Sequence, residues 1–82
     1  MSRKPAEKPN PARTVLQAFA ERDVSIRAIA RELSIEPSTV SRWPERNKGA
    51  GDIPSRYHRP LLDLAAKRGA LVTADVLITG RW

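Results

Sequence analysis

The chain has 82 residues, with 15 Lys and Arg against 9 Asp and Glu, no Cys and one His. This length allows one small domain, and the lack of Cys together with a single His excludes a disulfide framework and a zinc cluster. The formal net charge of +6 favours a polyanionic partner, of which nucleic acid is the leading candidate.

No apolar run approaches the roughly 20 residues that a membrane span needs. The N-terminus has basic residues but not the apolar core of a signal peptide. We therefore expect a soluble, cytoplasmic protein that holds neither a cofactor nor a metal ion.

The first eleven residues, "MSRKPAEKPNP", contain three prolines and four charged residues, and no large apolar residue after Met1. Such a segment has too little apolar surface to join a core. We predict a disordered basic arm over residues 1–10 and a folded domain over residues 11–82. Three basic side chains of the arm are candidates for DNA phosphate contacts: Arg3, Lys4 and Lys8.

The first predicted helix starts at Pro11, with Asn10 as its N-cap. Its apolar residues recur at helical spacing and predict one buried face, made of Val15, Leu16, Phe19 and Ala20.

The stretch "SIRAIARELSIEPSTVSRW", residues 25–43, contains two short amphipathic segments separated by a small polar turn. Ser25 is a good N-cap for a helix that ends near Leu33, and Pro37 is suited to the first position of the next helix. That helix, 37–43, is short because Pro44 disfavours helical geometry at Trp43. The pattern predicts a helix-turn-helix, in which the second helix enters the major groove of DNA.

Residues 44–52, rich in Gly and charge, are predicted to form a loop. A further helix ends at Gly69, and Pro60 leaves two possibilities: a single turn before a regular helix that begins at Pro60, or one kinked helix. A last short helix is capped by Thr73 and stops at Gly80. The predicted fold is all-α, a compact helix-turn-helix domain of about five short helices.

The motifs that carry a family resemblance are Ala30, the turn "SIEPS", Val40 and Trp43, followed by "IPSRYHRPLLDLAAKRGALVTADVLI". With these residues the chain resembles the phage Cro and repressor (lambda repressor-like) superfamily, especially short YdaS-like and Cro-like prophage regulators. The resemblance implies a domain that binds operator DNA, often as a dimer, and represses transcription. The chain departs from the family at Ser34, where Gly is usual, so a positive φ there would cost some strain.

The resemblance makes four residues of the second motif helix candidates for reading bases: Ser38, Thr39, Ser41 and Arg42. Their chemistry suits the task, since Arg bonds bidentately to guanine and hydroxyl groups contact several base edges. Phosphate contacts are expected from residues that flank the groove: Arg27, Pro37, Arg46 and Lys48. The plainer interpretations are a solvated helix charge for Arg42, a core position for Trp43 and an ordinary polar side chain for His58.

An enzyme is the weakest class, because the sequence has no Gly-rich phosphate loop, no catalytic carboxylate pair and no nucleophile with an assigned base. The alternatives to a repressor are a DNA-binding subunit of a phage machine, such as a small terminase or a recombination directionality factor, or an antitoxin with a protein partner. A purely protein-binding helical module is a third class.

The C-terminal segment carries more apolar side chains than a short helix can easily hide. We expect Leu71 and Leu77 to pack on the core of the monomer. Ile78 and Trp82 are then the residues through which a homodimer would form.

Overall fold

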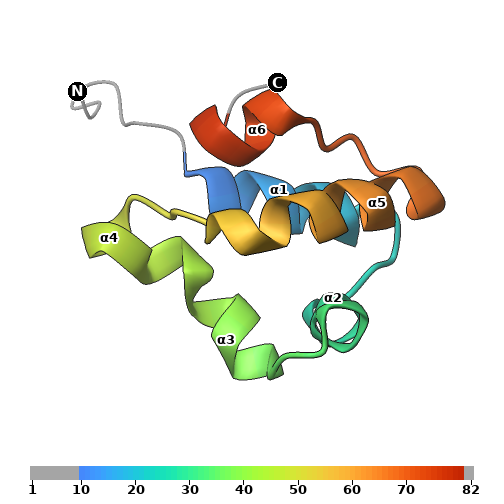
Figure 1. Cartoon of the computed structure of the whole chain (residues 1–82), viewed down its shortest axis with the longest axis horizontal. Coiled ribbons are helices and arrows are strands. Elements are labelled where there is room, and N and C mark those ends of the chain that lie inside the picture. The colour runs from blue at the N-terminus through green and yellow to red at the C-terminus, as the bar shows by residue number, and fades with distance from the viewer. Residues whose placement is uncertain (1–9, 81–82) are drawn as a thin grey trace, which may run out of the picture.

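The structure is a computed structural model that describes residues 10–80. Within this range the chain forms helices and loops and no strand, which confirms the all-α prediction (Figure 1). The regular helices are α1 (Pro11–Ala20), α2 (Ile26–Leu33), α3 (Pro37–Arg42), α5 (His58–Arg68) and α6 (Ala74–Thr79). The predicted contacts of Arg3, Lys4 and Lys8, and that of Trp82, lie outside the described residues.

The predicted caps form at the starts of three helices. The side-chain oxygens of Asn10, Ser25 and Thr73 each accept a hydrogen bond from a backbone N–H in the first turn of α1, α2 and α6 respectively. Pro37 occupies the first position of α3, where its missing N–H is not needed.

Asn10 does more than cap α1. Its Oδ1 accepts from the N–H of Arg13 at 2.9 Å, while Nδ2 donates to the carbonyl oxygens of Pro44 at 2.9 Å and Gly49 at 3.2 Å. Ala12 N–H also donates to the Gly51 carbonyl at 3.0 Å. The folded domain therefore includes Asn10, which sequence reasoning had placed in the arm as well as at the cap.

Three helices, α1, α2 and α5, are followed by a residue in the left-handed conformation, at which the chain reverses direction. The residues are Asp23 (φ 61°), Ser34 (φ 59°) and Gly69 (φ 74°). In each case the next N–H donates at 2.9 Å to the carbonyl five positions back, pairing Val24 with Phe19, Ile35 with Ala30 and Ala70 with Ala65. These are Schellman closures, which satisfy carbonyls that the helix end leaves free. Ser34 therefore adopts the positive φ that its turn position suggested.

The core is formed by side chains from all the regular helices and from the segment between α3 and α5. α6 packs against α1, and α2 packs against both α3 and α5. The largest fully buried side chains are Trp43, Phe19, Ile29, Leu61, Leu77, Val15, Val24, Val40 and Val76. Trp43 is thus a core residue. On α1 the prediction was wrong for Ala20, which is exposed, whereas Ala12 and Ala18 are buried.

The segment predicted as a loop has more local structure than expected. A 3₁₀ turn, η1 (Trp43–Glu45), continues the course of α3, and α4 (Arg46–Gly49) follows it. α4 is not a regular helix, because Asn47, Lys48 and Gly49 all have positive φ. The segment is better described as a tight turn than as either a helix or an open loop.

Pro60 lies in the first turn of α5, after a 3₁₀ turn, η2 (Ser55–Tyr57). Of the two sequence possibilities, the structure is closer to a separate turn followed by a regular helix, although the helix begins at His58. Pro60 is tolerated there because first-turn N–H groups have no partner within the helix.

Between residues 70 and 80 the structure differs from expectation at one residue, Leu71. Leu77 is buried, as predicted, and Ile78 is 67% exposed, but Leu71 is also 67% exposed rather than packed on the core. The neighbouring Val72 is 8% exposed and takes the inward position. The Val72 N–H donates to the Ala70 carbonyl at 3.0 Å, which closes a three-residue turn with Leu71 at its centre and leaves the Leu71 side chain exposed.

None of the helices between residues 10 and 80 is long and apolar enough to cross a membrane.

Candidate nucleic-acid interface

The α2 and α3 pair is held by a short turn, Ser34–Glu36. α2 buries Ile29 and Ala30, and α3 buries Val40. The carbonyl of Ala30 receives the N–H of Ile35, and Ile35 itself is partly buried against the core. The direction in which α3 leaves the turn is thus set by a backbone hydrogen bond and by an apolar contact.

The face of α3 opposite Val40 is polar and open to solvent. All four predicted base-reading residues are exposed there: Ser38, Thr39, Ser41 and Arg42. The hydroxyl of Ser41 donates to the Ser38 carbonyl at 3.1 Å, so it offers its oxygen to a base more readily than its hydrogen.

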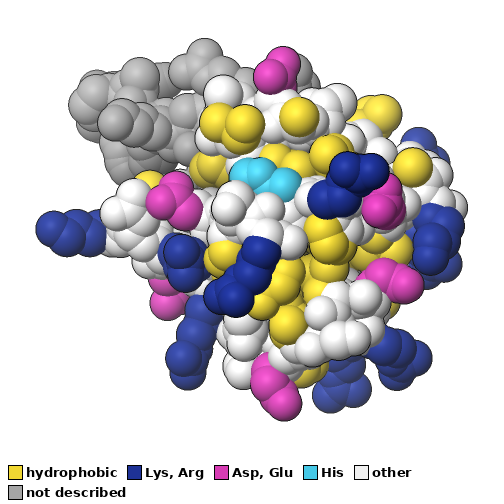
Figure 2. All heavy atoms as spheres, in the orientation of Figure 1, with side chains coloured by type: hydrophobic (Ala, Val, Ile, Leu, Met, Phe, Trp, Pro, Cys, Tyr) yellow, Lys and Arg dark blue, Asp and Glu magenta, His cyan; other side chains and the backbone are white. Residues whose placement is uncertain are grey.

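The predicted phosphate-contacting residues are exposed on α3 and on the elements before and after it. Arg27 is exposed in the first turn of α2, and Arg46 and Lys48 are exposed in α4. Pro37 is exposed at the start of α3, but a helix of six residues has a smaller dipole than a long one. In Figure 2, dark blue side chains gather over α3 and α4 at the lower left, with a few acidic ones among them.

A cleft of about 270 Å³ lies between α3, η1 and η2. We call it the arginine cleft, because it is lined by Arg42, Arg46 and Arg56, together with Thr39 and the rings of Trp43 and Tyr57. Within residues 10–80 none of its three guanidinium groups is paired with a carboxylate, whereas Lys67 and Glu32 on another face are 3.5 Å apart.

Arg56 was missed by the sequence reasoning. In the sequence, the 44–52 segment separates Arg56 from α3, so no pattern within one helix connects Arg56 with Arg42. An arginine directly before an aromatic residue in a basic chain was the available signal, and the structure places the Arg56 guanidinium 5.3 Å from the centre of the Tyr57 ring.

The aromatic residues of the cleft connect it with the core. The Tyr57 and Trp43 rings are 5.5 Å apart and inclined by 34°, and Trp43 is 1% exposed. The Trp43 Nε1 is buried and has no hydrogen-bond partner. An unpaired buried N–H costs about 1–3 kcal/mol of stability. Since the Trp43 indole makes no hydrogen bond, apolar packing alone holds it in place.

His58 is partly buried, and its Nε2 lies 3.0 Å from the carbonyl oxygen of Ile53. This contact ties the start of α5 to the preceding segment and is structural. Over the described range, no three His, Cys, Asp or Glu side chains are grouped so that they could hold a metal ion.

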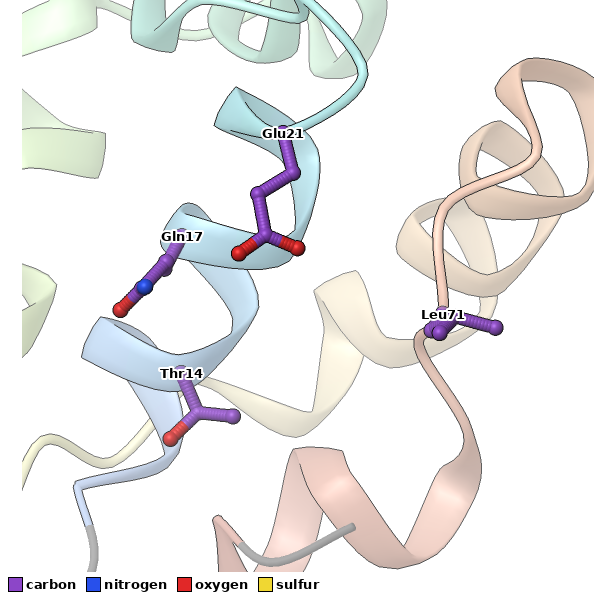
Figure 3. Close-up of a pocket in the computed structure, with 4 residues that line it drawn as sticks. All are labelled: Thr14, Gln17, Glu21 and Leu71. Carbon is purple, nitrogen blue, oxygen red and sulfur yellow. The ribbon is translucent and has the colours of Figure 1, made fainter.

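A second depression, of about 380 Å³, lies on another side of the molecule (Figure 3). Thr14 and Gln17 of α1 and Glu21, which follows α1, line it together with the exposed Leu71. It has one carboxylate and no basic side chain among these residues, so it does not extend the basic surface.

Comparison of the chain with models of protein families, with curated proteins and with solved structures finds no match. The features of the molecule that bear on its function are the geometry and chemistry of the α2 and α3 pair and the basic residues around it.

Proposed function

We propose that the protein is a sequence-specific DNA-binding regulator of transcription, a phage or prophage repressor of the Cro type that reads the major groove with α3. The observation that carries the proposal is the short, bonded turn between α2 and α3, which leaves Ser38, Thr39 and Arg42 exposed on a helix packed by its opposite face. A helix-turn-helix presents its second helix to DNA in this manner.

The chemistry of the exposed face supports this proposal. Arg42 can form two hydrogen bonds to the O6 and N7 atoms of guanine, and the Thr39 methyl group suits the methyl group of thymine. The hydroxyl oxygens of Ser38 and Ser41 can accept from adenine or cytosine amino groups. Glu36 at the start of α3 is unfavourable near phosphate and helps to reject wrong alignments.

Charge supports the same partner. The net charge of +6 attracts duplex DNA of any sequence. Arg27, Arg46 and Lys48 are exposed on the elements before and after α3, and they are the proposed contacts to the DNA backbone. Pro37 and the arm residues Arg3, Lys4 and Lys8 belong to the same set of proposed phosphate contacts. A protein that acts on the DNA of a bacterial host works in the cytoplasm, associated with the nucleoid.

We further propose that two copies bind together on DNA through the C-terminal segment. Ile78 is exposed on α6, and Trp82 follows in the same segment. A twofold dimer would set two α3 helices about 34 Å apart, one turn of the duplex. The test is sedimentation at increasing concentration, combined with titration of duplexes that carry one or two half-sites. A monomer that binds one half-site as tightly as two would exclude the dimer.

The experiment that tests the function is selection of bound sites from random duplex DNA. We expect a defined sequence to be enriched, and a palindrome if two copies bind. If the selected pool stays random while the folded protein is present, sequence-specific regulation is excluded.

Two variants then separate base reading from phosphate binding. Arg42→Ala should weaken binding to the selected site by about 1–3 kcal/mol and to random DNA by much less. Arg46→Ala should weaken both to a similar degree, because every sequence has the same backbone. Equal losses on both DNAs for Arg42→Ala would remove it from the base-reading residues.

A further inference from the structure

The arginine cleft gathers three positive charges on two separate parts of the fold. Arg42 and Arg46 come from α3 and α4, and Arg56 comes from η2. All three are exposed, and in the described part of the chain none has a carboxylate to neutralise it. Like charges around a small cleft repel one another, and an anion in the cleft would relieve this repulsion.

Aromatic packing fixes the position of one of the three arginines, Arg56. Arg56 lies over the face of Tyr57, Tyr57 contacts the Trp43 ring, and Trp43 is fixed in the core. A guanidinium group that already rests on an aromatic ring loses less side-chain freedom when it binds a ligand. The planar donor fork of arginine matches the oxygens of phosphate, with which it forms paired, charge-assisted hydrogen bonds.

We infer that the arginine cleft binds one phosphate group, supplied by the DNA backbone, and that Arg56 is a DNA-contacting residue. This inference depends on the proposed function, and it adds a contact that would fix the position of the protein on the DNA. A phosphate seated beside Arg46 and Arg56 would determine where along the groove α3 lies. Arg42 borders both the cleft and the exposed face of α3, so the residues that test the cleft are Arg46 and Arg56.

The main test compares Arg56→Gln with Arg59→Gln. Arg59 is also exposed and lies on α5, but it does not line the cleft, so it controls for the loss of one charge. Binding to the selected duplex and to a random duplex is measured over a range of salt concentrations, with circular dichroism to show that both variants remain folded.

We expect Arg56→Gln to weaken binding to both duplexes about three- to tenfold, and to reduce the slope of log K against log salt by about 0.9. Arg59→Gln should change affinity less than about twofold. Arg56→Lys, which keeps the charge but not the fork, should recover the salt slope but only part of the affinity. If Arg56→Gln and Arg59→Gln behave alike, the cleft does not hold a backbone phosphate.

A second measurement separates failure of the cleft from failure of the proposed function. The Nε–H signals of Arg46, Arg56 and Arg59 are followed by NMR while duplex DNA, and separately inorganic phosphate, is added. Saturable shifts of Arg46 and Arg56 with DNA, larger than that of Arg59, support the inference. Shifts with phosphate but none with DNA would leave an anion cleft and overturn its assignment to DNA. The absence of shifts with either ligand would overturn the cleft itself, whatever the selection experiment finds.

Discussion

Replacement of Asn10 by Ala tests how the segment with Arg46 and Lys48 is held. Asn→Ala at an N-cap costs about 1 kcal/mol. Asn10 also donates to the carbonyls of Pro44 and Gly49, and each such hydrogen bond contributes about 0.5–1.5 kcal/mol net. The expected loss is about 2–4 kcal/mol, which lowers the Tm of a domain of this size by about 10–30 °C.

The assay is urea unfolding followed by circular dichroism, with two kinds of comparison. Ser25→Ala and Thr73→Ala each remove a cap that makes one hydrogen bond, so each should cost about 1 kcal/mol. Asn10→Asp keeps the capping oxygen but sets a carboxylate oxygen, which cannot donate, against the carbonyl oxygens of Pro44 and Gly49, so it should destabilise the domain more than Ser25→Ala does. If Asn10→Ala were no more destabilising than Ser25→Ala, the long-range bonds would contribute nothing and the reasoning would be refuted.

Four further outcomes are expected. Ser34→Gly should raise stability by about 0.5–1 kcal/mol, since Gly accepts the left-handed conformation without the strain of a side chain; an unchanged urea midpoint would contradict this. Gly51→Ala should lower stability by about 2–4 kcal/mol, because φ is +80° and a Cβ would overlap the Asn10 amide. In thermal melts, Leu61→Ala should cost about 2–5 kcal/mol, while Leu71→Ala should stay within about 0.5 kcal/mol. Deletion of residues 1–9, leaving Asn10 in place, should preserve the melting curve and flatten the salt dependence of DNA binding by about 0.9 per lost phosphate contact.

The features that sequence reasoning predicted well are determined by neighbours in the chain. Asn10, Ser25 and Thr73 were expected as caps because a cap depends on one side chain and the next three residues. The end of α5 at Gly69 follows in the same way from the freedom of Gly to adopt positive φ. The periodic apolar residues of α2 likewise predict a buried face before any partner is known.

The features that it missed depend on distant parts of the chain. The turn at Asn47 and Lys48 is fixed partly by Asn10, and no local pattern shows that these segments meet. Arg56 reaches the candidate interface only because η2 folds back beside α3. Leu71 was assigned to the core on composition, but it lies at the centre of the turn that the hydrogen bond between Val72 and Ala70 closes, and Val72 is the buried residue.

The three Schellman closures also bear on the order of folding. Each joins residues five positions apart, so the corners around α2 and after α5 can close on the time scale of local chain motion, well below a microsecond for loops of about ten residues. The bond between Asn10 and Gly49 spans 39 positions and that between Thr14 and Gly80 spans 66, so both must wait for distant segments to meet. The α2 and α3 corner is therefore expected to form early. The segment with Arg46 and Lys48, and then α6, would reach their final places only when the start of α1 has met them.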